Sequence, residues 1–337
     1  MPPSLEWTEP GAFEVARNVY RIPLPMPSDS LHAVNVYVLY SDDGLVLIDG
    51  GWAVPEGRNA LIKALAHLGA SPHDIHRFLV THVHRDHYTQ AVAMRREFGA
   101  GVGLGHGERA TLELMRQPDR SPLTNQIATL PELGAPELAR RLGATQGERR
   151  DVTEWETPDE WLEEGPIPLF ADRVLHAVST PGHTAGHLVF HDLENRLLFA
   201  GDHVLPAITP SIGLEASLSG NPLGAFLNSL AVVRSRPDAM LLAAHGPVAP
   251  SAHARVDELI AHHDERLDEI HRLADSGAGS PGEIAQAMRW TRRGLRLTEL
   301  APFSGMMAVF ETTAHLELLV AQGRLSMSMR DGVRHYR

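Results

Sequence analysis

The sequence predicts a layered α/β fold, with sheets inside and helices outside. Short apolar runs of strand length alternate with segments of helical spacing, and several of the runs end in a loop that carries histidine or aspartate. The composition, 43% hydrophobic and 21% charged, is that of an ordinary globular protein. Because 337 residues are many for one domain, we expect a large domain and a smaller one.

The first elements follow from alternating and helical patterns. Residues 34–40 and 44–48 are predicted to be two strands joined by a Ser-Asp-Asp turn. The stretch "NALIKALAHLGAS" has helical spacing and a stop at Gly69. The apolar run "HRFLVTH" is typical of a buried strand that delivers side chains from its C-terminal end. We expect strand, helix and strand again over residues 173–200.

Residues 108–164 interrupt this sheet pattern. They are polar, predicted to be helical in pieces, and they carry Trp155 and Trp161. A surface insertion and a lid over a pocket both fit this composition, because long insertions near ligand-bearing loops often form pocket walls. We therefore expect a helical insertion or lid within the larger domain.

The C-terminal part predicts helices followed by a hairpin. The stretch "RVDELIAHHDERLDEIHRLADSG" suits one long helix, and shorter helical patterns lie around residues 281–289 and 310–322. A hairpin is expected around Asp331-Gly332. Three helices and a hairpin suggest a winged-helix module. The predicted domains are therefore residues 1–250 and 255–337.

Four potential metal ligands lie close together in the stretch "LVTHVHRDHYT". His82 and His84 are two apart at a predicted strand end, so both point the same way, while Asp86 and His87 lie on the following turn. The chain has no cysteine, which leaves imidazole and carboxylate as side-chain ligands. Zinc takes about four ligands and keeps one position open when it is catalytic. Other loops must therefore supply the remaining ligands.

Three later loops offer such ligands. They are "STPGHTAGH" with His183, "LLFAGDHVL" with Asp202 and "MLLAAHGPV" with His245. Each loop follows an apolar stretch, and glycine beside each ligand allows a close approach of the backbone. Any one of these histidines alone is more readily a helix cap or a satisfied core residue. The seven residues together favour a metal site.

The order of these motifs resembles that of the metallo-β-lactamase superfamily. The matching segments are "LIDGG", "THVHRDH", "TPGHT", "AGD" and "AHG", and the resemblance covers roughly residues 15–250. It implies an αββα metallo-β-lactamase sandwich with a dinuclear site at one edge of two sheets. By position it implies His82, His84 and His183 on the first metal, Asp86, His87 and His245 on the second, and Asp202 as the bridge. Asp49 matches a residue that supports the site by hydrogen bonding near a ligand.

The C-terminal region narrows the resemblance to the β-lactamase-like protein 2 branch. That branch includes ribonucleases and relatives with thioesterase-type activity. One departure from the family pattern is that Tyr88 and Thr89, in place of a small pair, follow the histidine cluster. Tyr88 is then either a wall of the pocket or a hydrogen-bond donor to substrate, and we favour the wall.

The predicted function is a zinc-dependent metallohydrolase that attacks an acyl bond in a thioester, lactone or ester. Two zinc ions would share a water and present hydroxide, which Asp86 or Asp202 orients and whose proton one of them carries. Iron and manganese tolerate the same ligands. The net charge of −12 and the two tryptophans of the insertion favour a small or medium acyl substrate over a polyanion.

Cleavage of single-stranded RNA at the same site is the alternative. Its support is the predicted winged-helix tail and the arginines of "RWTRRGLR", namely Arg289, Arg292, Arg293 and Arg296. Against it, residues 251–337 hold 11 arginines and 12 acidic residues, so we favour a solvated loop over a nucleic-acid patch. β-Lactamase activity is a weaker interpretation, because one scaffold hosts many chemistries.

A non-catalytic binding or dimerisation module is a further class of function, in which the tail packs against a partner subunit. The complete ligand set argues against it. Neither a signal-peptide pattern nor an apolar stretch of about 18 residues is visible, so a cytoplasmic protein without a membrane partner is expected. Oligomerisation through the C-terminal domain fits the same sequence.

Overall fold

The computed structural model describes residues 6–27, 29, 31–117, 123–145, 152–170, 173–215, 220–277 and 279–337. The chain divides into two compact units. The first consists of Met1–Arg116, Asp151–Pro210 and Ser229–Val256, and the second of Gln117–Arg150, Ser211–Asn228 and Asp257–Arg337. These units do not follow the predicted boundary at residues 250–255, because parts of the predicted insertion pack with the C-terminal segment.

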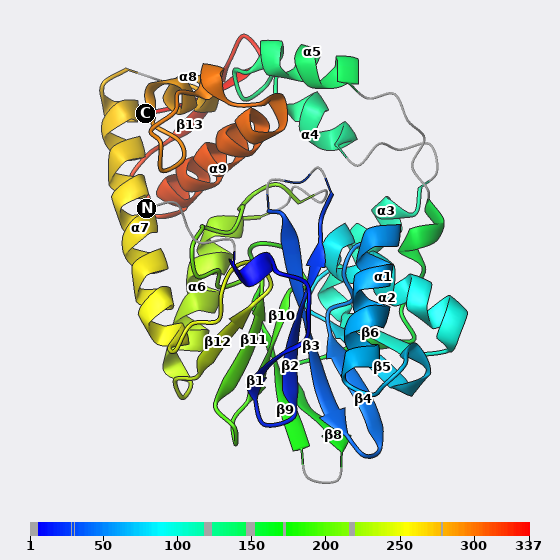
Figure 1. Ribbon diagram of the computed structural model, residues 1–337. Coiled ribbons are helices and arrows are strands. Elements are labelled where there is room, and N and C mark those ends of the chain that lie inside the picture. The colour runs from blue at the N-terminus through cyan, green and yellow to red at the C-terminus, as the bar shows by residue number, and fades with distance from the viewer. Residues whose placement is uncertain are drawn as a thin grey trace. The chain divides into compact units, whose positions relative to one another are not determined.

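A seven-stranded mixed sheet lies in the first unit (Figure 1). Its strands, in spatial order, are β1 (Phe13–Ala16), β2 (Val19–Pro25), β3 (Ala33–Ser41), β4 (Gly44–Ile48), β5 (Ile75–Val80), β6 (Gly101–Gly105) and β7 (Glu160–Leu162). Neighbours from β1 to β4 are antiparallel, and those from β4 to β7 are parallel. The predicted pair of strands at 34–40 and 44–48 is confirmed as the hairpin β3–β4.

Helices α1 (Pro55–His67) and α2 (Arg85–Phe98) cover one face of this sheet. Leu61 of α1 and Val92 of α2 share a buried apolar cluster with Phe78 of β5. Proline at the first helical position suits the start of α1, since the first turn needs no intrahelical N–H bond there. Gly69, at φ 75°, follows the helix end and confirms the predicted stop.

The second sheet of this unit has five strands. They are, in spatial order, β12 (Met240–Ala243), β11 (Leu197–Gly201), β10 (Leu188–Asp192), β9 (Arg173–Ser179) and β8 (Gly165–Phe170). Leu39 and Ile48 of the first sheet share a second buried cluster with Phe190 and Phe199 of this one, so the two sheets pack face to face.

The part of helix α6 (Pro222–Ser235) that belongs to the first unit, from Ser229 onward, supplies the outer layer of the second sheet. In its C-terminal half, Ser229 Oγ donates to Pro181 O at 2.8 Å. Just beyond the helix, Arg236 Nε donates to His191 Nδ1 of β10 at 3.3 Å. Helix, sheet, sheet and helix follow in order, which confirms the predicted αββα sandwich.

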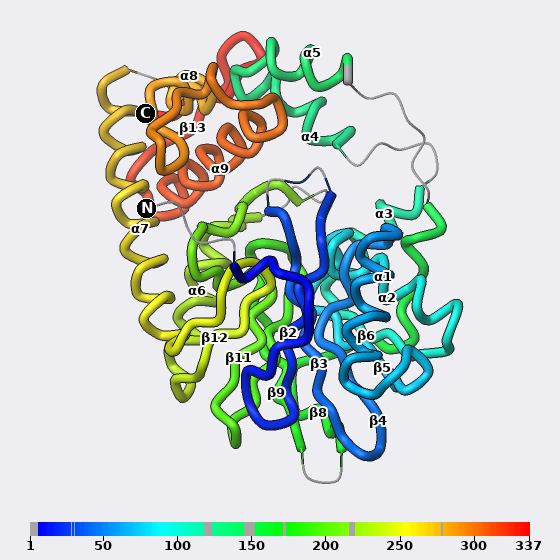
Figure 2. The backbone as a smooth tube through the Cα atoms, viewed as in Figure 1, coloured from blue at the N-terminus to red at the C-terminus, as the bar shows by residue number. Residues whose placement is uncertain are grey.

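The helix predicted within residues 173–200 is wrong. Strands β9, β10 and β11, labelled in Figure 1, succeed one another as an antiparallel meander. A loop over residues 180–187 joins the first two, and Figure 2 traces the same backbone as a tube. The loop sequence "TPGHTAGH" contains one proline and two glycines. Proline and glycine are poor residues for a helix interior, so this loop keeps an irregular path between the strands.

The predicted insertion at 108–164 is helical only in part. It contains α3 (Arg109–Met115), α4 (Thr124–Thr129), α5 (Pro136–Thr145) and a 3-10 turn at Val152–Trp155. Strand β7 lies inside it and extends the first sheet beside β6, so this segment does not simply interrupt the sheet pattern as predicted. Trp155 is buried and stacks on Tyr88 at a ring separation of 6.5 Å, and therefore belongs to the core instead of a lid.

The second unit contains one long helix from Asp257 onward, two shorter C-terminal helices and a small hairpin. They are α7 (Ala252–Asp275), α8 (Pro281–Ala287), α9 (Pro302–Ala321), β13 (Met327–Arg330) and β14 (Val333–Tyr336). The predicted long helix and hairpin are confirmed, and α9 begins earlier than the predicted residue 310, with Pro302 at its first position. Asp331 and Gly332 have φ of 49° and 78°, the left-handed conformations that a two-residue hairpin turn requires.

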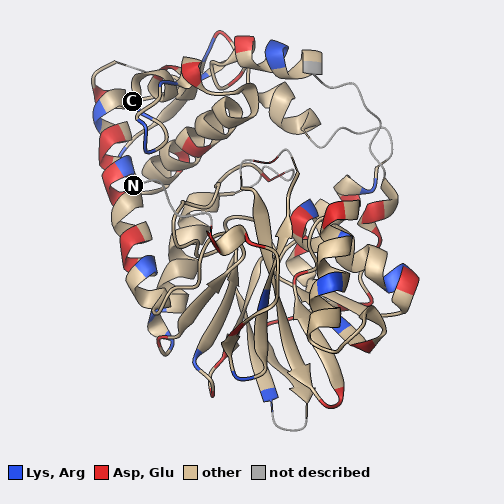
Figure 3. Cartoon of the chain, in the orientation of Figure 1, with Lys and Arg blue, Asp and Glu red and all other residues tan. Residues whose placement is uncertain are grey.

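Three arginines are interspersed among seven acidic residues along α7, as the blue and red segments of this helix show (Figure 3). Mixed signs of this kind suit a solvated helix face. In the ranges that the structure describes, no helix combines the length and the apolar character needed to cross a bilayer.

Candidate metal centre

The structure brings all seven predicted ligand side chains together in two groups. The first group is His82, His84, His183 and Asp202, and the second is Asp86, His87 and His245. Within each group the ligand atoms lie within 4.8 Å of one another. Apart from the half-buried His84, every one of these residues is buried. Two clusters that can each hold a metal ion are consistent with a dinuclear site.

The loop between β5 and α2, together with the first turn of α2, presents four of the seven residues. His82 and His84 lie beyond Val80, the last residue of β5, so bends in the loop and not strand pleating orient them. Asp86 and His87 occupy the first turn of α2. The prediction that the two histidines follow the end of a strand is therefore confirmed. The prediction that strand pleating makes both side chains point the same way is wrong.

Glycine is required where β11 delivers Asp202. Gly201 has φ 50°, and a Cβ there would lie 2.6 Å from Thr81 Oγ1 and 2.8 Å from His187 Nε2. No larger residue fits without displacing these neighbours. Asp202 follows this glycine directly, as predicted, whereas His183 lies four residues beyond the end of β9.

Two buried side chains of β3 position the loop of His245. Asn35 Nδ2 donates to Ala243 O at 3.0 Å and to Gly246 O at 2.9 Å, and Tyr37 Oη donates to Ala243 O at 2.8 Å. His245 Nδ1 donates in turn to Ala33 O at 2.8 Å, which leaves its Nε2 facing the second group. Asn35 was not predicted to act here, although a lone asparagine in an apolar strand is a usable signal.

The nitrogens of the first group converge at distances that suit one shared ion. His82 Nε2 and His183 Nε2 lie 2.9 Å and 3.1 Å from His84 Nδ1. Zinc–nitrogen bonds of about 2.0–2.1 Å place tetrahedral ligands about 3.3 Å apart. Burial lowers the pKa of His84 to about 3 and that of His82 well below its ordinary value. Both rings are therefore neutral, the form that binds metal.

Asp202 faces both groups. Its Oδ1 lies 3.7 Å from His87 Nε2 and 3.4 Å from His245 Nε2, and its Oδ2 lies 3.5 Å from His183 Nε2. Asp86 Oδ2 lies 3.6 Å from His87 Nε2 and 3.3 Å from His245 Nε2. One carboxylate between two sets of nitrogens has the arrangement of a bridging ligand.

Buried atoms without hydrogen bonds show that the second group fits a metal ion. His87 Nε2, His245 Nε2 and Asp202 Oδ1 are buried and have no hydrogen-bond partner among the described residues. Buried polar atoms are rarely left unsatisfied in native proteins. A cation bound between the two nitrogens and the carboxylate would satisfy all three atoms.

The electrostatics of the second group favour positive charge. Burial lowers the pKa of His87, but the carboxylates of Asp49, Asp86 and Asp202 outweigh this effect and raise the pKa to about 10. Burial raises the pKa of the Asp86 and Asp202 carboxyls, and the neighbouring histidines more than reverse this, so both lie below their ordinary value. Ionised carboxylates at this point attract either a proton or a metal ion.

Asp49 supports the second group, as predicted. Its Oδ2 accepts a hydrogen bond from His87 Nδ1 at 2.9 Å, and its Oδ1 accepts from Thr81 N at 2.8 Å. A carboxylate on the far nitrogen fixes the tautomer and orientation of a ligating histidine. This contact leaves His87 Nε2 directed toward Asp86 and Asp202.

Tyr88 is neither a pocket wall nor a donor to substrate, so both predicted roles are wrong. Its side chain is fully buried, and its hydroxyl donates to Glu156 O at 2.5 Å. Its position on α2 turns it toward the core, away from the metal ligands in the same helical turn. Thr89 Oγ1 donates to Arg85 O at 2.6 Å and accepts from Ala53 N at 2.9 Å.

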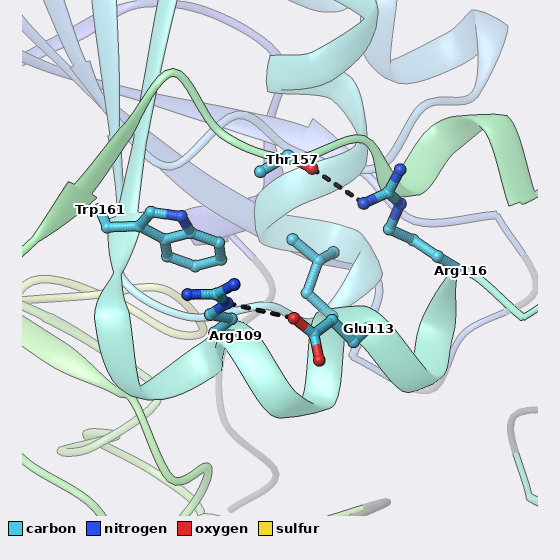
Figure 4. Close-up of a pocket in the computed structure, with 6 residues that line it drawn as sticks. Arg109, Glu113, Arg116, Thr157 and Trp161 are labelled. Atoms are coloured by element: carbon cyan, nitrogen blue, oxygen red, sulfur yellow. Dashed lines mark hydrogen bonds and ion pairs between the residues drawn. The ribbon is translucent and has the colours of Figure 1, made fainter.

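Trp161 lines a small pocket formed by α3, β7 and the segment before β7 (Figure 4). The pocket has a volume of about 200 Å³ and is lined by Arg109, Leu112, Glu113, Arg116, Thr157 and Trp161. Arg109 Nε donates to Glu113 Oε1 at 3.1 Å, and Arg116 Nη1 donates to Thr157 Oγ1 at 2.9 Å. This pocket is polar, and none of the seven ligand candidates lines it. Trp161 therefore does not form the predicted apolar cover for an acyl group.

Comparison with known proteins places these residues in a family. A family model described as "Metallo-beta-lactamase superfamily" matches residues 30–245, the range that holds all seven ligand candidates. A crystal structure of a metallo-beta-lactamase family protein from Thermus thermophilus is 27% identical with a TM-score of 0.77, over 96% of this chain and 99% of that chain.

Two curated relatives are similar over shorter stretches. Hydroxyacylglutathione hydrolase of Rhizobium johnstonii is 27% identical over 128 residues, which are 38% of this chain and 33% of that protein. The beta-lactamase-like protein 2 homolog of Caenorhabditis elegans is 29% identical over 125 residues, which are 37% of this chain and 40% of that protein. The chain therefore matches only about a third to two fifths of the length of these relatives.

Proposed function

This chain belongs to the metallo-beta-lactamase superfamily, and from that premise we propose that it is a dinuclear zinc hydrolase that cleaves an acyl bond, with thioesters as the preferred class. One observation carries the proposal. The carboxylate of Asp202 faces two groups of ligand atoms at once, and buried nitrogens of His87 and His245 beside it lack hydrogen bonds among the described residues.

Zinc is proposed because the donor set is rich in imidazole. The two groups contain five histidines and two aspartates, whereas magnesium and calcium prefer all-oxygen ligation. When bound, zinc supplies Lewis acidity that lowers the pKa of water and polarises a scissile carbonyl. Elemental analysis of the purified protein distinguishes zinc from iron and manganese.

The residues of the chain have separate tasks in this proposal. His82, His84 and His183 would hold the first ion, and His87 and His245 would hold the second together with Asp86. In its ionised form the Asp86 carboxylate orients the attacking water, accepts its proton at Oδ1 and returns that proton to the leaving group. A thiol leaving group needs this proton less than an alkoxide does, because thiols are the stronger acids.

A thioester is supported by the likeness to hydroxyacylglutathione hydrolase, whose name specifies an acylated glutathione as its substrate. An acyl group carried on the sulfur of glutathione is a thioester. The net charge of −12 also makes a long polyanion a poor electrostatic match. The tryptophans give no support, because Trp155 lies in the core and Trp161 lines a polar pocket.

Hydrolysis of single-stranded RNA at the same site is the second candidate. The observation in its favour is that four arginines around Trp290 are all exposed: Arg289, Arg292, Arg293 and Arg296. Exposed arginines bind phosphates when they line one face. The near-equal balance of arginines and acidic residues in the C-terminal segment argues against this candidate.

A substrate panel tests the proposal. The zinc-loaded protein is given an acylglutathione, an acyl-CoA, a lactone and single-stranded RNA, and kcat/KM is measured for each at one moderate salt concentration. We expect thioester hydrolysis that His82→Ala abolishes and that His106→Ala, at an exposed histidine outside the two groups, leaves unchanged. Efficient RNA cleavage that His82→Ala abolishes, without measurable acyl hydrolysis, would overturn the proposal.

A further inference from the structure

His187 is a buried histidine beside the metal ligands, yet it belongs to neither of the two ligand groups among the described residues. Its ring stacks on that of His82 with a centroid separation of 5.0 Å and an interplanar angle of 27°. Its Nε2 lies 3.2 Å from the backbone nitrogen of Asp202, and its Nδ1 lies 2.9 Å from Thr180 Oγ1. One side chain thus touches a ligand of the first group and the candidate bridge.

The contacts at both ends of the ring define its tautomer. Thr180 Oγ1 donates its proton to His187 O at 3.3 Å, so the same oxygen accepts from Nδ1–H of the ring. The backbone N–H of Asp202 can only donate, so Nε2 of His187 accepts this hydrogen bond. Burial lowers the pKa of His187 well below its ordinary value, which agrees with a neutral ring.

This tautomer excludes His187 as a further metal ligand. Nδ1 carries the proton, and the lone pair of Nε2 is already occupied by the Asp202 N–H. A ligating histidine needs a free nitrogen lone pair. The role of His187 must therefore be exerted through the residues that it holds.

The contact with Asp202 is tight enough to position that residue. A Cβ at Gly201 would lie 2.8 Å from His187 Nε2, so the peptide before Asp202 is pressed against the ring. One face of the same ring stacks on His82, which is itself fully buried. Movement of the ring would displace a ligand of the first group and the shared carboxylate together.

We propose that His187 is a positioning residue that sets the spacing between His82 and the bridging Asp202, and so determines how tightly both metal ions are held. The inference rests on the dinuclear site of the proposed function and is independent of the substrate. Thr180 takes part by keeping the Nδ1–H tautomer in place.

Three variants separate the elements of this arrangement. His187→Phe keeps a stacking ring but removes the acceptor for the Asp202 N–H. His187→Gln removes the ring but keeps an acceptor near the position of Nε2. Thr180→Val removes the hydroxyl that selects the tautomer. The matched control is His191→Phe, because His191 is also buried, lies on the adjoining strand β10 and contacts Arg236 in place of the ligands.

The measurements are zinc content, zinc affinity by chelator competition and the visible absorption of the cobalt(II)-substituted protein. We expect His187→Phe to bind zinc about 10- to 100-fold more weakly and to alter the cobalt spectrum, as loss of a residue that orients a ligand does. His187→Gln should recover most of the affinity, and Thr180→Val should lie between the two. His191→Phe should match the wild type in both readouts.

Wild-type zinc affinity and an unchanged cobalt spectrum in His187→Phe would overturn the inference. If that variant does not fold, the same result in Thr180→Val overturns it. A wild-type protein that binds no zinc would remove the dinuclear site and this inference with it. Two zinc ions without acyl hydrolysis would contradict only the substrate of the proposed function and, with weakened binding in His187→Phe, support the role of His187.

Discussion

Asp49 shows how much one side chain can organise in this molecule. Its carboxylate accepts hydrogen bonds from Thr81 N and from His87 Nδ1, and its φ of 63° lies in the left-handed region. A non-glycine residue held there costs on the order of 1 kcal/mol or more. The hydrogen bonds of the carboxylate offset that cost. They also orient the ligand candidate His87 and tie the end of β4 to the loop that carries His82.

Asp49→Asn is expected to weaken zinc binding by about 10- to 100-fold. The amide has one acceptor oxygen in place of two, so its NH2 group must face either Thr81 N or His87 Nδ1, both of which are donors. Chelator competition measures the change. Asp43→Asn, in the exposed turn between β3 and β4, is the control and should bind as the wild type does. Equal affinities for both variants would contradict the role given to Asp49.

Asp202→Ala is expected to lose more metal than any other single ligand variant. Its carboxylate faces both groups, whereas Asp86 belongs to the second group alone. Removing it leaves two cations a few ångströms apart without the shared anion, and their repulsion disfavours both. Elemental analysis should show loss of both ions in Asp202→Ala and retention of the first ion in Asp86→Ala. Full zinc content in Asp202→Ala would refute the bridging assignment.

The sequence is a good guide to the candidate ligands and a poor one to their neighbours. Residues such as Asp202 and His245 follow short apolar strands, so local pattern and chain order suffice to predict that they meet. The role of His187 depends on a backbone N–H fifteen residues away, which no motif reveals. The predictions for Tyr88 and Trp155 are wrong because local pattern does not say which side of a segment packs on a distant one.

Gly50, two residues beyond the end of β4, allows this segment to approach helix α2 closely. Its N–H donates to His87 O at 2.8 Å, and a Cβ would lie 2.5 Å from Ala91 N of α2. The atom in the way belongs to the backbone, so a side-chain rotation cannot relieve the clash. This glycine lets the end of β4 touch the helix that carries Asp86 and His87.

Gly50→Ala is therefore expected to lower the free energy of unfolding by about 1–3 kcal/mol, as overpacking does. Gly143 on α5 is the matched control, because a Cβ there meets no atom within 4 Å. Gly143→Ala should raise stability by up to about 1 kcal/mol, since alanine favours the helix. Calorimetric melting temperatures that shift in the same direction for both variants would contradict this explanation.

Elements with a strong internal pattern are predictable, and those set by distant partners are not. The hairpin β3–β4 alternates clearly, and α7 repeats its apolar positions over 24 residues, so tertiary context is not needed. Strand β7 has only three residues and owes its conformation to pairing with β6. The helix predicted within residues 173–200 is wrong because the proline and glycines of the 180–187 loop outweigh any helical spacing there.

For the molecule as a whole, surface charge distinguishes thioester hydrolysis from RNA cleavage. Reversing two exposed arginines, Arg292→Glu with Arg293→Glu, should change kcat/KM for a thioester by less than about twofold, because a surface charge outside the site is screened by salt. If RNA is the substrate, the same variant should bind RNA more weakly and with a flatter salt dependence, because fewer counterions are released. Thioester kinetics and RNA titrations at several salt concentrations measure both effects.

A buried histidine pair makes the second unit sensitive to acid. His263 Nδ1 and His315 Nε2 lie 3.2 Å apart, and His263 Nε2 has no hydrogen-bond partner among the described residues. Burial, with smaller contributions from neighbouring positive charge, lowers the pKa of His263 to about 2 and that of His315 to about 4. Glu311 on the same helix as His315 acts in the opposite sense, because burial raises its pKa to about 7.

Stability should fall as the pH drops from about 7 to 4. The unfolded histidines take up protons near pH 6.5 while the folded pair does not, so protons bind preferentially to the unfolded chain in this window. Glu311 opposes the trend, since the folded carboxyl takes up its proton first. His263→Gln removes one histidine and leaves Glu311, so its free energy of unfolding should vary less steeply with pH than that of the wild type. Identical pH slopes in the two proteins would disprove this account.

The hydrogen bonds from Asn35 to the carbonyls of Ala243 and Gly246 also bear on how the protein is made. The partners are separated by 208 and 211 residues. At a synthesis rate of about 5–20 residues per second, on the order of ten to forty seconds pass between the synthesis of Asn35 and that of its two carbonyl partners. The nascent chain can therefore carry His82 and His84 long before it has His245. The complete set of metal ligands is therefore present only after His245 has been synthesised. Until then the incomplete first sheet of the nascent chain must be kept from pairing with other strands.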